Sequence, residues 1–440
     1  MGDTVLLCPG DYTVLVAASA LRFMFRRDHI TDQRDPGTAV RPSPRAARLW
    51  DWLTGRHSKN SAYWLILGPT IALTCIGVVM VLSASSVEFI GGAGSFASLS
   101  SQGLYAVIGL VILFWMKKWR RRTYHKLAVV VLLLSIVLLM LVFTPLGFEV
   151  NGGRRWIRLG GFSFQPAEAA KLSFSVWAAY ALNEKLKIKA WGKDLLVPVV
   201  FPFGAIIVAL ILGGKDIGTV LIMLMMIAVI LYLGGIRTVY LAITGALGLV
   251  ALILVTLQSG NRKMRIDAWL GKCDHPADPC YQYEQGIFAL ASGGWFGQGL
   301  GQSRQKWSYI PEAGNDLIFA VLGEELGLIG SLVVIGLFIM LGIGMFRVAY
   351  NATDSFVLIS TGAIMTWLLG QALMNIAMVT GFLPIIGVPL PFISSGGSAL
   401  LLSILAVGVV LSFARHQAQE DNPTSPPAQS QLDRVAKIEG

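Results

Sequence analysis

The segment PEAGNDLIFAVLGEELG, residues 311–327, places carboxylates beside an otherwise apolar run: Glu312, Asp316, Glu324 and Glu325. A carboxylate can act as a general base if it is ionised and within hydrogen-bond reach of a hydroxyl. Asp316 could instead cap a helix, and Asn would then replace it well, because Asn and Asp cap about equally. Glu324 and Glu325 lie within a GxxxG spacing that permits close helix packing, so we interpret them mainly as structural partners of nearby cations.

Positive charges gather in a second segment, NGGRRWIRLGGFSFQPAEAAKLSF, residues 151–174. Cationic side chains can offset the charge of a phosphate or an anionic lipid head group. Arg155 and Lys171 are the first candidates for this task, and Arg154 and Lys306 follow them. The alternative is that these side chains extend along the lipid to the interface and bind nothing.

Lys171 and two further residues of this second segment each have two interpretations. A helix that begins at Pro166 places Glu168 and Lys171 one turn apart on one face. The two could form a pair that only neutralises itself, or both could serve an anion site. Trp156 could contact substrate, or it could be an aromatic anchor at the membrane interface.

The third segment, GFLPIIGVPLPFISSGGSALLL, residues 381–402, combines prolines and glycines with Ser394 and Ser395 just before an apolar run. Non-helical backbone at membrane depth must be buried in protein or line a wet cavity. The alternative is an ordinary proline-rich loop.

The elements that must position these residues are membrane helices. The chain has 440 residues, of which 55% are hydrophobic and 14% charged, with a mean hydropathy of +0.65. This composition excludes an ordinary soluble protein, and the long apolar runs indicate helices and not barrel strands. The sequence predicts an all-α integral membrane protein of ten spans, with re-entrant or interfacial loops. The predicted spans are residues 63–83, 101–116, 127–144, 169–182, 195–212, 217–235, 239–257, 317–346, 357–379 and 399–413.

Charge fixes the predicted orientation. Residues 1–62 form a basic N-terminal extension, which the positive-inside rule keeps cytoplasmic, and an even number of spans returns the C-terminus to the same side. The membrane domain is expected over residues 63–415, with a large extracytoplasmic loop at 258–316. The polar tail at 416–440 cannot bury a core and is expected to be disordered.

This orientation places many basic residues outside, against the insertion rule, which suggests that they have a use. They are Arg154, Arg155, Arg158, Lys171, Lys215, Arg262, Lys263, Arg265, Lys272, Arg304 and Lys306. Cys273 and Cys280 lie in the same outer region, so we predict a disulfide between them, with two free thiols as the alternative. The cysteines and histidines show no zinc-ligand spacing.

Taken together, the motifs resemble the SEDS family of bacterial cell-wall proteins (shape, elongation, division, sporulation). The matching stretches are VLSASS (81–86), NGGRRWIRLGGFSFQPAEAAKL, GGWFGQGLGQSRQKWSYIPEAGNDLIFAVLGEELG and PLPFISSGGSALL. The resemblance covers about residues 63–415 and is closest to the division type of the family. One departure is that Gly314, Asn315, Asp316 and Leu317 stand where the family often has His-Thr-Asp-Phe.

The resemblance implies a ten-span glycosyltransferase that polymerises lipid II at the outer face of the bacterial cytoplasmic membrane, at the division septum. It implies a class B penicillin-binding protein and other division proteins as partners, and no nucleic acid. Asp316 would be the catalytic residue, and Glu168, Glu312, Ser394 and Ser395 would join the cations and Trp156 in binding substrate. No cofactor is certain, but Mg²⁺ or Mn²⁺ could bridge pyrophosphate and Asp316 or Glu312. The alternatives are a lipid II flippase, a non-catalytic scaffold and an elongation-type polymerase.

Overall fold

The structure, a computed structural model, describes residues 51–54, 60–85, 94–150, 152–159, 162–188, 199–236, 238–243, 245–246, 248, 260–272, 279–303 and 314–420. Residues 1–57 and residues 58–440 are two compact units. Only residues 51–54, within a helix, are described in the first unit. The second unit contains all the elements that carry the predicted chemistry.

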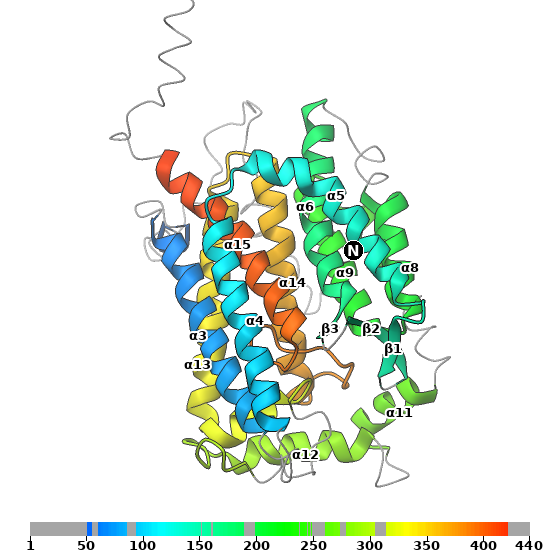
Figure 1. The fold of residues 1–440 in the computed structure, drawn as a ribbon, viewed down its shortest axis with the longest axis vertical. Coiled ribbons are helices and arrows are strands. Elements are labelled where there is room, and N and C mark those ends of the chain that lie inside the picture. Colours follow the sequence, from blue (N-terminus) through cyan, green and yellow to red (C-terminus); the bar gives the residue numbers. More distant parts are fainter. Residues whose placement is uncertain are drawn as a thin grey trace, which may run out of the picture. The chain divides into compact units, whose positions relative to one another are not determined.

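The second unit is a bundle of apolar helices (Figure 1). Within the described part of the chain, five helices are long and apolar enough to span a membrane, which makes this a multi-pass membrane protein. They belong to α3 (Asn60–Ser85), α5 (Arg121–Leu141), α13 (Ile318–Tyr350), α14 (Ser355–Val379) and α15 (Gly397–Glu420). The other bundle helices are α4 (Gly94–Met116), α6 (Pro166–Lys187), the π-helical turn η1 (Val200–Gly204) with α8 (Ala205–Gly213), and α9 (Ile217–Leu233).

These helices correspond to the predicted spans, apart from the span at 239–257, which lies largely outside the described residues. The helical membrane fold is therefore confirmed, and the count of ten stays a prediction. α15 continues to Glu420, past the boundary predicted at residue 415. The rest of the predicted tail lies outside the described residues.

A small antiparallel sheet, which the sequence did not predict, joins α5 to α6. Its strands are β1 (Gly147–Val150), β2 (Gly153–Leu159) and β3 (Phe162–Phe164), in the order β1-β2-β3. Gly152 has φ +75° in the turn between β1 and β2, a backbone conformation that favours glycine. Ile157 is buried on the central strand and pairs with Gly147 on one side and Phe164 on the other. The prediction of an all-α chain with a loop here was incomplete, because three short strands can satisfy one another's backbone.

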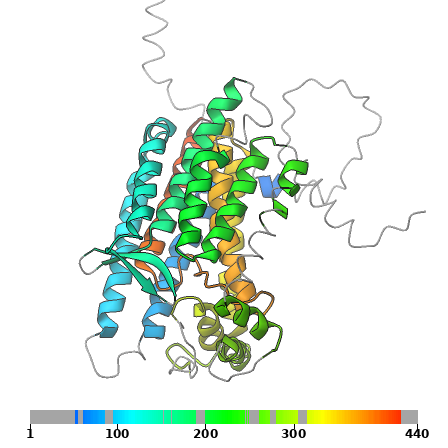
Figure 2. The ribbon, with the colours of Figure 1, turned by 90° about the vertical axis from the view of Figure 1, so that its right-hand side faces the viewer.

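Two helices lie within the loop predicted at 258–316: α11 (Gly260–Trp269) and α12 (Pro279–Ser292). They lie at the same end of the bundle as the sheet in both views (Figures 1 and 2). Trp269 Nε1 donates a hydrogen bond of 2.9 Å to the carbonyl of Gly381, which ties α11 to the segment after α14. This end of the bundle therefore carries ordered structure over the helix ends.

α13 is broken near its start, at Gly327, whose φ of +69° and ψ of −168° are not helical. The break exposes main-chain carbonyls. Those of Glu324 and Glu325 accept hydrogen bonds from the backbone N–H groups of Gln298 and Gly299, respectively. A Cβ on Gly327 would lie 2.3 Å from the nitrogen of Gly297, so the GxxxG spacing does permit close approach. The partner is the loop after α12, and residues 316–347 are not one straight helix.

Candidate functional site

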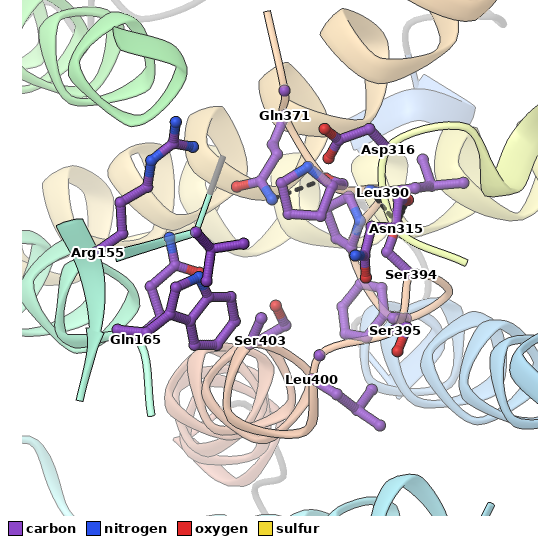
Figure 3. A pocket seen from close by; sticks show the side chains of 18 residues that line it. Arg155, Gln165, Asn315, Asp316, Gln371, Leu390, Ser394, Ser395, Leu400 and Ser403 are labelled. Carbon is purple, nitrogen blue, oxygen red and sulfur yellow. Dashed lines mark hydrogen bonds between the residues drawn. The ribbon is translucent and has the colours of Figure 1, made fainter. Parts of the chain in front are cut away.

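A cavity of about 110 Å³ opens at the end of the bundle that carries the sheet. Figure 3 shows side chains from several elements pointing toward it. Its polar lining comes from β2, from the N-cap of α6, from the turn before α13, from α14, and from α15 and the loop that leads into it. The polar and aromatic lining residues are Arg155, Trp156, Gln165, Asn315, Asp316, Gln371, Phe392, Ser394, Ser395 and Ser403. Of the predicted site residues, Arg155, Trp156, Asp316, Ser394 and Ser395 therefore meet in one place.

Asp316 lies in the turn just before α13. The N-cap position of that helix is Leu317, which makes no side-chain cap hydrogen bond, so Asp316 does not occupy the position that its capping interpretation assumed. Asn375, on α14, holds the backbone of Asp316: its Nδ2 donates to the carbonyl of Asp316 at 2.8 Å and to that of Val388 at 2.7 Å. The carboxylate faces Gly387, where a Cβ would lie 3.2 Å from Asp316 Oδ2 and 3.7 Å from Arg265 Nη1. Asp316 thus has its main chain fixed and its carboxylate at the cavity.

The loop before α15 clamps the same turn from the other side. Ser394 Oγ donates to the carbonyl of Asn315 at 2.7 Å and accepts from the N–H of Leu390 at 2.7 Å. The N–H of Ser395 donates to the carbonyl of Gly314 at 2.8 Å. The non-helical stretch predicted at membrane depth therefore lines a cavity, as one of its two interpretations required. Ser394 uses its hydroxyl to hold this loop, whereas Ser395 presents its side chain at the lining.

Arg155 brings positive charge to the cavity from β2. Its Nη1 lies 3.9 Å from Asp216 Oδ1, its side chain is 27% exposed, and its buried Nε has no hydrogen-bond partner among the described residues. Asp216 is held independently, because it caps α9 by accepting from the N–H of Thr219 at 3.1 Å. A loose, partly exposed ion pair leaves the guanidinium able to bind an anion. The sequence offered one signal for Asp216, a carboxylate just before an apolar run, but we had not selected it.

Arg154 is not among the residues that line this cavity, although it was selected as a substrate ligand. Its Nη2 donates to the carbonyls of Thr144 and Gly147, both at 3.2 Å. These bonds fix the connection between α5 and the sheet. Glu149 pairs with Arg154 and Phe148 pairs with Trp156, so Arg155 is the extra residue of a β-bulge. A bulge interrupts the regular alternation of the strand and redirects a side chain, which gives Arg154 and Arg155 different surroundings.

Lys171 is buried inside the bundle and does not line the cavity. Its Nζ donates to Glu168 Oε1 at 2.8 Å and to Gln371 Oε1 at 2.8 Å, and it lies 4.8 Å from the ring centroid of Trp367. Both Lys171 and Glu168 are 1% exposed. The self-neutralising pair, which was one interpretation of the sequence, is therefore present, and direct substrate binding by these two residues has no support from their placement.

Lys306 and Glu312 lie outside the described residues, as does Cys273. Cys280 is disulfide-bonded, and its pairing with Cys273 stays a prediction. Glu324 and Glu325 are buried and accept hydrogen bonds of 2.5 Å from Ser303 and Ser83. No group of three His, Cys, Asp or Glu side chains suited to a metal occurs in the described part of the chain.

Four polar residues at or near the cavity were missed: Gln165, Asn315, Gln371 and Asn375. Gln371 and Asn375 are one turn apart on α14 and donate to the consecutive carbonyls of Pro389 and Val388. The signal was available, because an amide inside an apolar helix must find hydrogen-bond partners. Which partners it finds depends on the fold.

The chain is similar to a family of known proteins. The family model for cell cycle proteins of the FtsW, RodA and SpoVE group matches residues 63–419. The probable peptidoglycan glycosyltransferase FtsW of Mycobacterium tuberculosis is 37% identical over 388 residues, which cover 88% of this chain and 72% of the relative. The protein of the same description from Geobacter sulfurreducens is 39% identical over 356 residues, covering 80% and 94%.

A solved structure has the same fold. It is described as showing the structural coordination of polymerization and crosslinking by a peptidoglycan synthase complex. One of its chains matches with a TM-score of 0.65 at 24% identity, covering 81% of this chain and 98% of that one.

Proposed function

We infer that this chain, which belongs to the FtsW, RodA and SpoVE family of cell cycle proteins, is a peptidoglycan glycosyltransferase of the division type. The relatives from M. tuberculosis and G. sulfurreducens both carry the name FtsW, which favours division over elongation. The proposed substrate is lipid II, a disaccharide pentapeptide on undecaprenyl pyrophosphate. The product is a glycan strand.

The observation that carries this proposal is that Asp316 and Arg155 line one cavity. They are its charged lining residues in the described part of the chain, and they have the opposite charges that the reaction needs. In the proposed step, the acceptor's sugar hydroxyl oxygen attacks C1 of the donor sugar, with inversion. The bond from C1 to the pyrophosphate oxygen breaks, and the lipid pyrophosphate leaves.

Asp316 takes the proton of the attacking hydroxyl, so it must be ionised beforehand. Arg155 offsets the charge that develops on the leaving pyrophosphate. Asn375 and the loop of Ser394 hold the turn that carries Asp316 by main-chain contacts. A fixed carboxylate spends little free energy on reorganisation during the step, which is how such sites stabilise a transition state.

A divalent cation is a separate proposal. The described residues of the cavity lining supply one carboxylate, Asp316, and no set of ligands for Mg²⁺ or Mn²⁺. A cation would therefore need oxygen ligands from the pyrophosphate for most of its coordination, as Mg²⁺ commonly takes from phosphates. The fit of the protein groups alone is poor, and no step is assigned to a metal.

We place the cavity at the outer face of the cytoplasmic membrane, at the septum, with both termini inside. The basic loops at 117–126 and 183–193 support this orientation through the positive-inside rule. A class B penicillin-binding protein is the proposed partner, since the matching solved structure is of a complex that couples polymerization and crosslinking. The cavity's position at one end of the bundle is less suited to a flippase, which needs polar groups along a path across the membrane.

The test is polymerisation of labelled lipid II by the purified full-length chain together with its class B partner. We expect glycan strands that lysozyme digests. Transport of lipid II across vesicles without polymerisation would favour the flippase, and neither activity would favour a scaffold. The partner alone is the control for contaminating polymerase.

A further inference from the structure

One buried side chain connects the Lys171 ion pair to the cavity. Gln371, on α14, accepts hydrogen bonds at its Oε1 from Lys171 Nζ at 2.8 Å and from Trp367 Nε1 at 3.0 Å. Its Nε2 donates to the carbonyl of Pro389 at 2.9 Å. The same side chain is part of the cavity lining (Figure 3). Gln371 is therefore the contact between a buried cation and the proposed substrate space.

The orientation of this amide is fixed by chemistry. A lysine ammonium and an indole N–H can only donate, and a backbone carbonyl can only accept. Rotating the Gln371 amide by 180° would set two donors against its NH₂ group and an oxygen against the carbonyl of Pro389. The oxygen must therefore face Lys171 and Trp367, and the NH₂ group must face the loop and the cavity.

Within the described part of the chain, the hydrogen count leaves one N–H of Gln371 available to a ligand. An amide nitrogen has two hydrogens, and the bond to Pro389 uses one of them. Lys171 has no spare N–H donor for a ligand within the described part of the chain. Two of its ammonium hydrogens go to Glu168 and Gln371, and the third faces the Trp367 ring. A cation bound at the oxygen also polarises the amide, which strengthens the N–H groups as donors.

We propose that Gln371 binds an anionic oxygen of the substrate through its second Nε2 hydrogen, and that Lys171 is a positioning residue that orients and polarises this amide. The inference rests on the proposed function for the identity of the ligand, which is the pyrophosphate of a lipid-linked sugar. Lys171 then acts on substrate through Gln371, without leaving its buried pair with Glu168. Arg155 and Gln371 would hold the same leaving group from different elements of the lining.

Two variants test Gln371. Gln371→Glu keeps an acceptor for Lys171 and Trp367 but, when ionised, has no donor. Gln371→Met removes all polar atoms without adding charge. We expect both to raise the KM for lipid II about tenfold with little change in kcat, which corresponds to about 1.4 kcal/mol of binding shared by ground and transition states.

The matched control is Gln417→Met. Gln417 also donates from Nε2 to a backbone carbonyl, that of Val348 at 3.0 Å, but it lies on the last turns of α15, away from the cavity. It should leave the KM unchanged. Thermal unfolding of all variants in the same detergent separates lost binding from lost folding, and Gln371→Glu remains informative if Gln371→Met is unstable.

The role of Lys171 needs a coupling test. Glu168→Gln with Lys171→Met removes both charges at once, so that neither is left buried alone. This pair of changes should raise the KM as the Gln371 variants do, and adding Gln371→Met should raise it no further, because the two act through one contact. Additive increases would show that Lys171 does not act through Gln371.

A binding measurement keeps this inference separate from the proposed function. Undecaprenyl pyrophosphate in nanodiscs should bind the Gln371 variants about tenfold more weakly than the wild-type chain. Equal affinity, together with an unchanged KM, would overturn the role of Gln371. A wild-type chain that binds this lipid in a Gln371-dependent way but does not polymerise lipid II would overturn the proposed function and support the inference.

Discussion

At the scale of single residues, the contacts divide the predicted cations and carboxylates by role. Arg155 and Asp316 line the cavity. Arg154 is held by backbone carbonyls, and Lys171 is held in a buried ion pair with Glu168. Charge alone did not distinguish them in the sequence. Substitutions at these positions should therefore have different consequences.

Asp316→Asn should abolish polymerisation and leave the fold intact. The amide keeps the shape of the side chain, and the contacts that hold this turn use the main chain of residues 314–316. Loss of a general base costs about 10²- to 10⁴-fold in rate. The measurement is the rate of glycan formation by correctly inserted protein, and a rate near that of the wild type would refute the assignment.

Arg155→Ala should lower kcat/KM for lipid II by about 10- to 100-fold, because a charge-assisted hydrogen bond contributes about 1.5–3 kcal/mol. Arg154→Ala is the matched control: it loses bonds to two carbonyls, so it should lower the melting temperature and leave the KM unchanged. If both substitutions changed kcat/KM equally, Arg155 would have no role in substrate binding that Arg154 lacks.

Gly387→Ala should impair catalysis by crowding Asp316. Its φ is +75° and a Cβ there would lie 3.2 Å from Asp316 Oδ2. Gly235→Ala shares the backbone cost without the contact, since its φ is +90° and a Cβ there would have no heavy atom of the described residues within 4 Å. Each should lose about 1–2 kcal/mol of stability from the left-handed backbone, but only Gly387→Ala should also reduce kcat. Comparable kcat values in the two variants would contradict this.

At the scale of elements, the broken start of α13 has the clearest consequence. The break at Gly327 lets the loop after α12 reach the carbonyls of Glu324 and Glu325. It also means that the length of one straight helix does not give the distance from Asp316 to the far end of α13. The elements around the cavity are instead positioned by side-chain amides and by the loop before α15.

Gly327→Ala should destabilise the protein by more than about 3 kcal/mol. The backbone region of Gly327 is essentially restricted to glycine, and a Cβ would lie 2.3 Å from the nitrogen of Gly297. Gly336 lies in the same helix, and a Cβ there would have no heavy atom of the described part of the chain within 4 Å. Gly336→Ala should therefore be neutral or stabilising by up to about 1 kcal/mol. Thermal unfolding in detergent compares the two, and similar melting temperatures would show that the break is not required.

At the scale of the whole molecule, the proposed orientation places the two ends of the bundle on opposite sides of the membrane. Lys118 lies between α4 and α5 at one end, and Lys263 lies on α11 at the end that carries the cavity. Both side chains are exposed. Their opposite placement provides a direct test of which end faces outward.

Lys263→Cys should react with a membrane-impermeant maleimide in intact cells, and Lys118→Cys should react only after the cells are opened. The wild-type chain gives the background from its own cysteines, including the exposed Cys75. The opposite pattern would place the cavity in the cytoplasm and would exclude polymerisation at the outer face.

The membrane helices and several cavity residues could be predicted from the sequence because their signals are local. A long apolar run must satisfy its own backbone in lipid, and so it must be helical. The positions of Asp316 and Ser395 beside such runs, within motifs shared by a family, were sufficient to select them. The three-stranded sheet was missed, because its short strands carry little signal until they pair with one another.

The tertiary structure alone decided which charges are available to a ligand. Arg154 and Arg155 are adjacent and chemically identical, yet strand geometry turns one to carbonyls and the other to the cavity. Lys171 and Gln371 are far apart in the sequence, and only packing of α6 against α14 brings the ammonium to the amide. A side chain's hydrogen-bonding capacity is set by its type, but the use of that capacity depends on neighbours that the chain supplies only when folded.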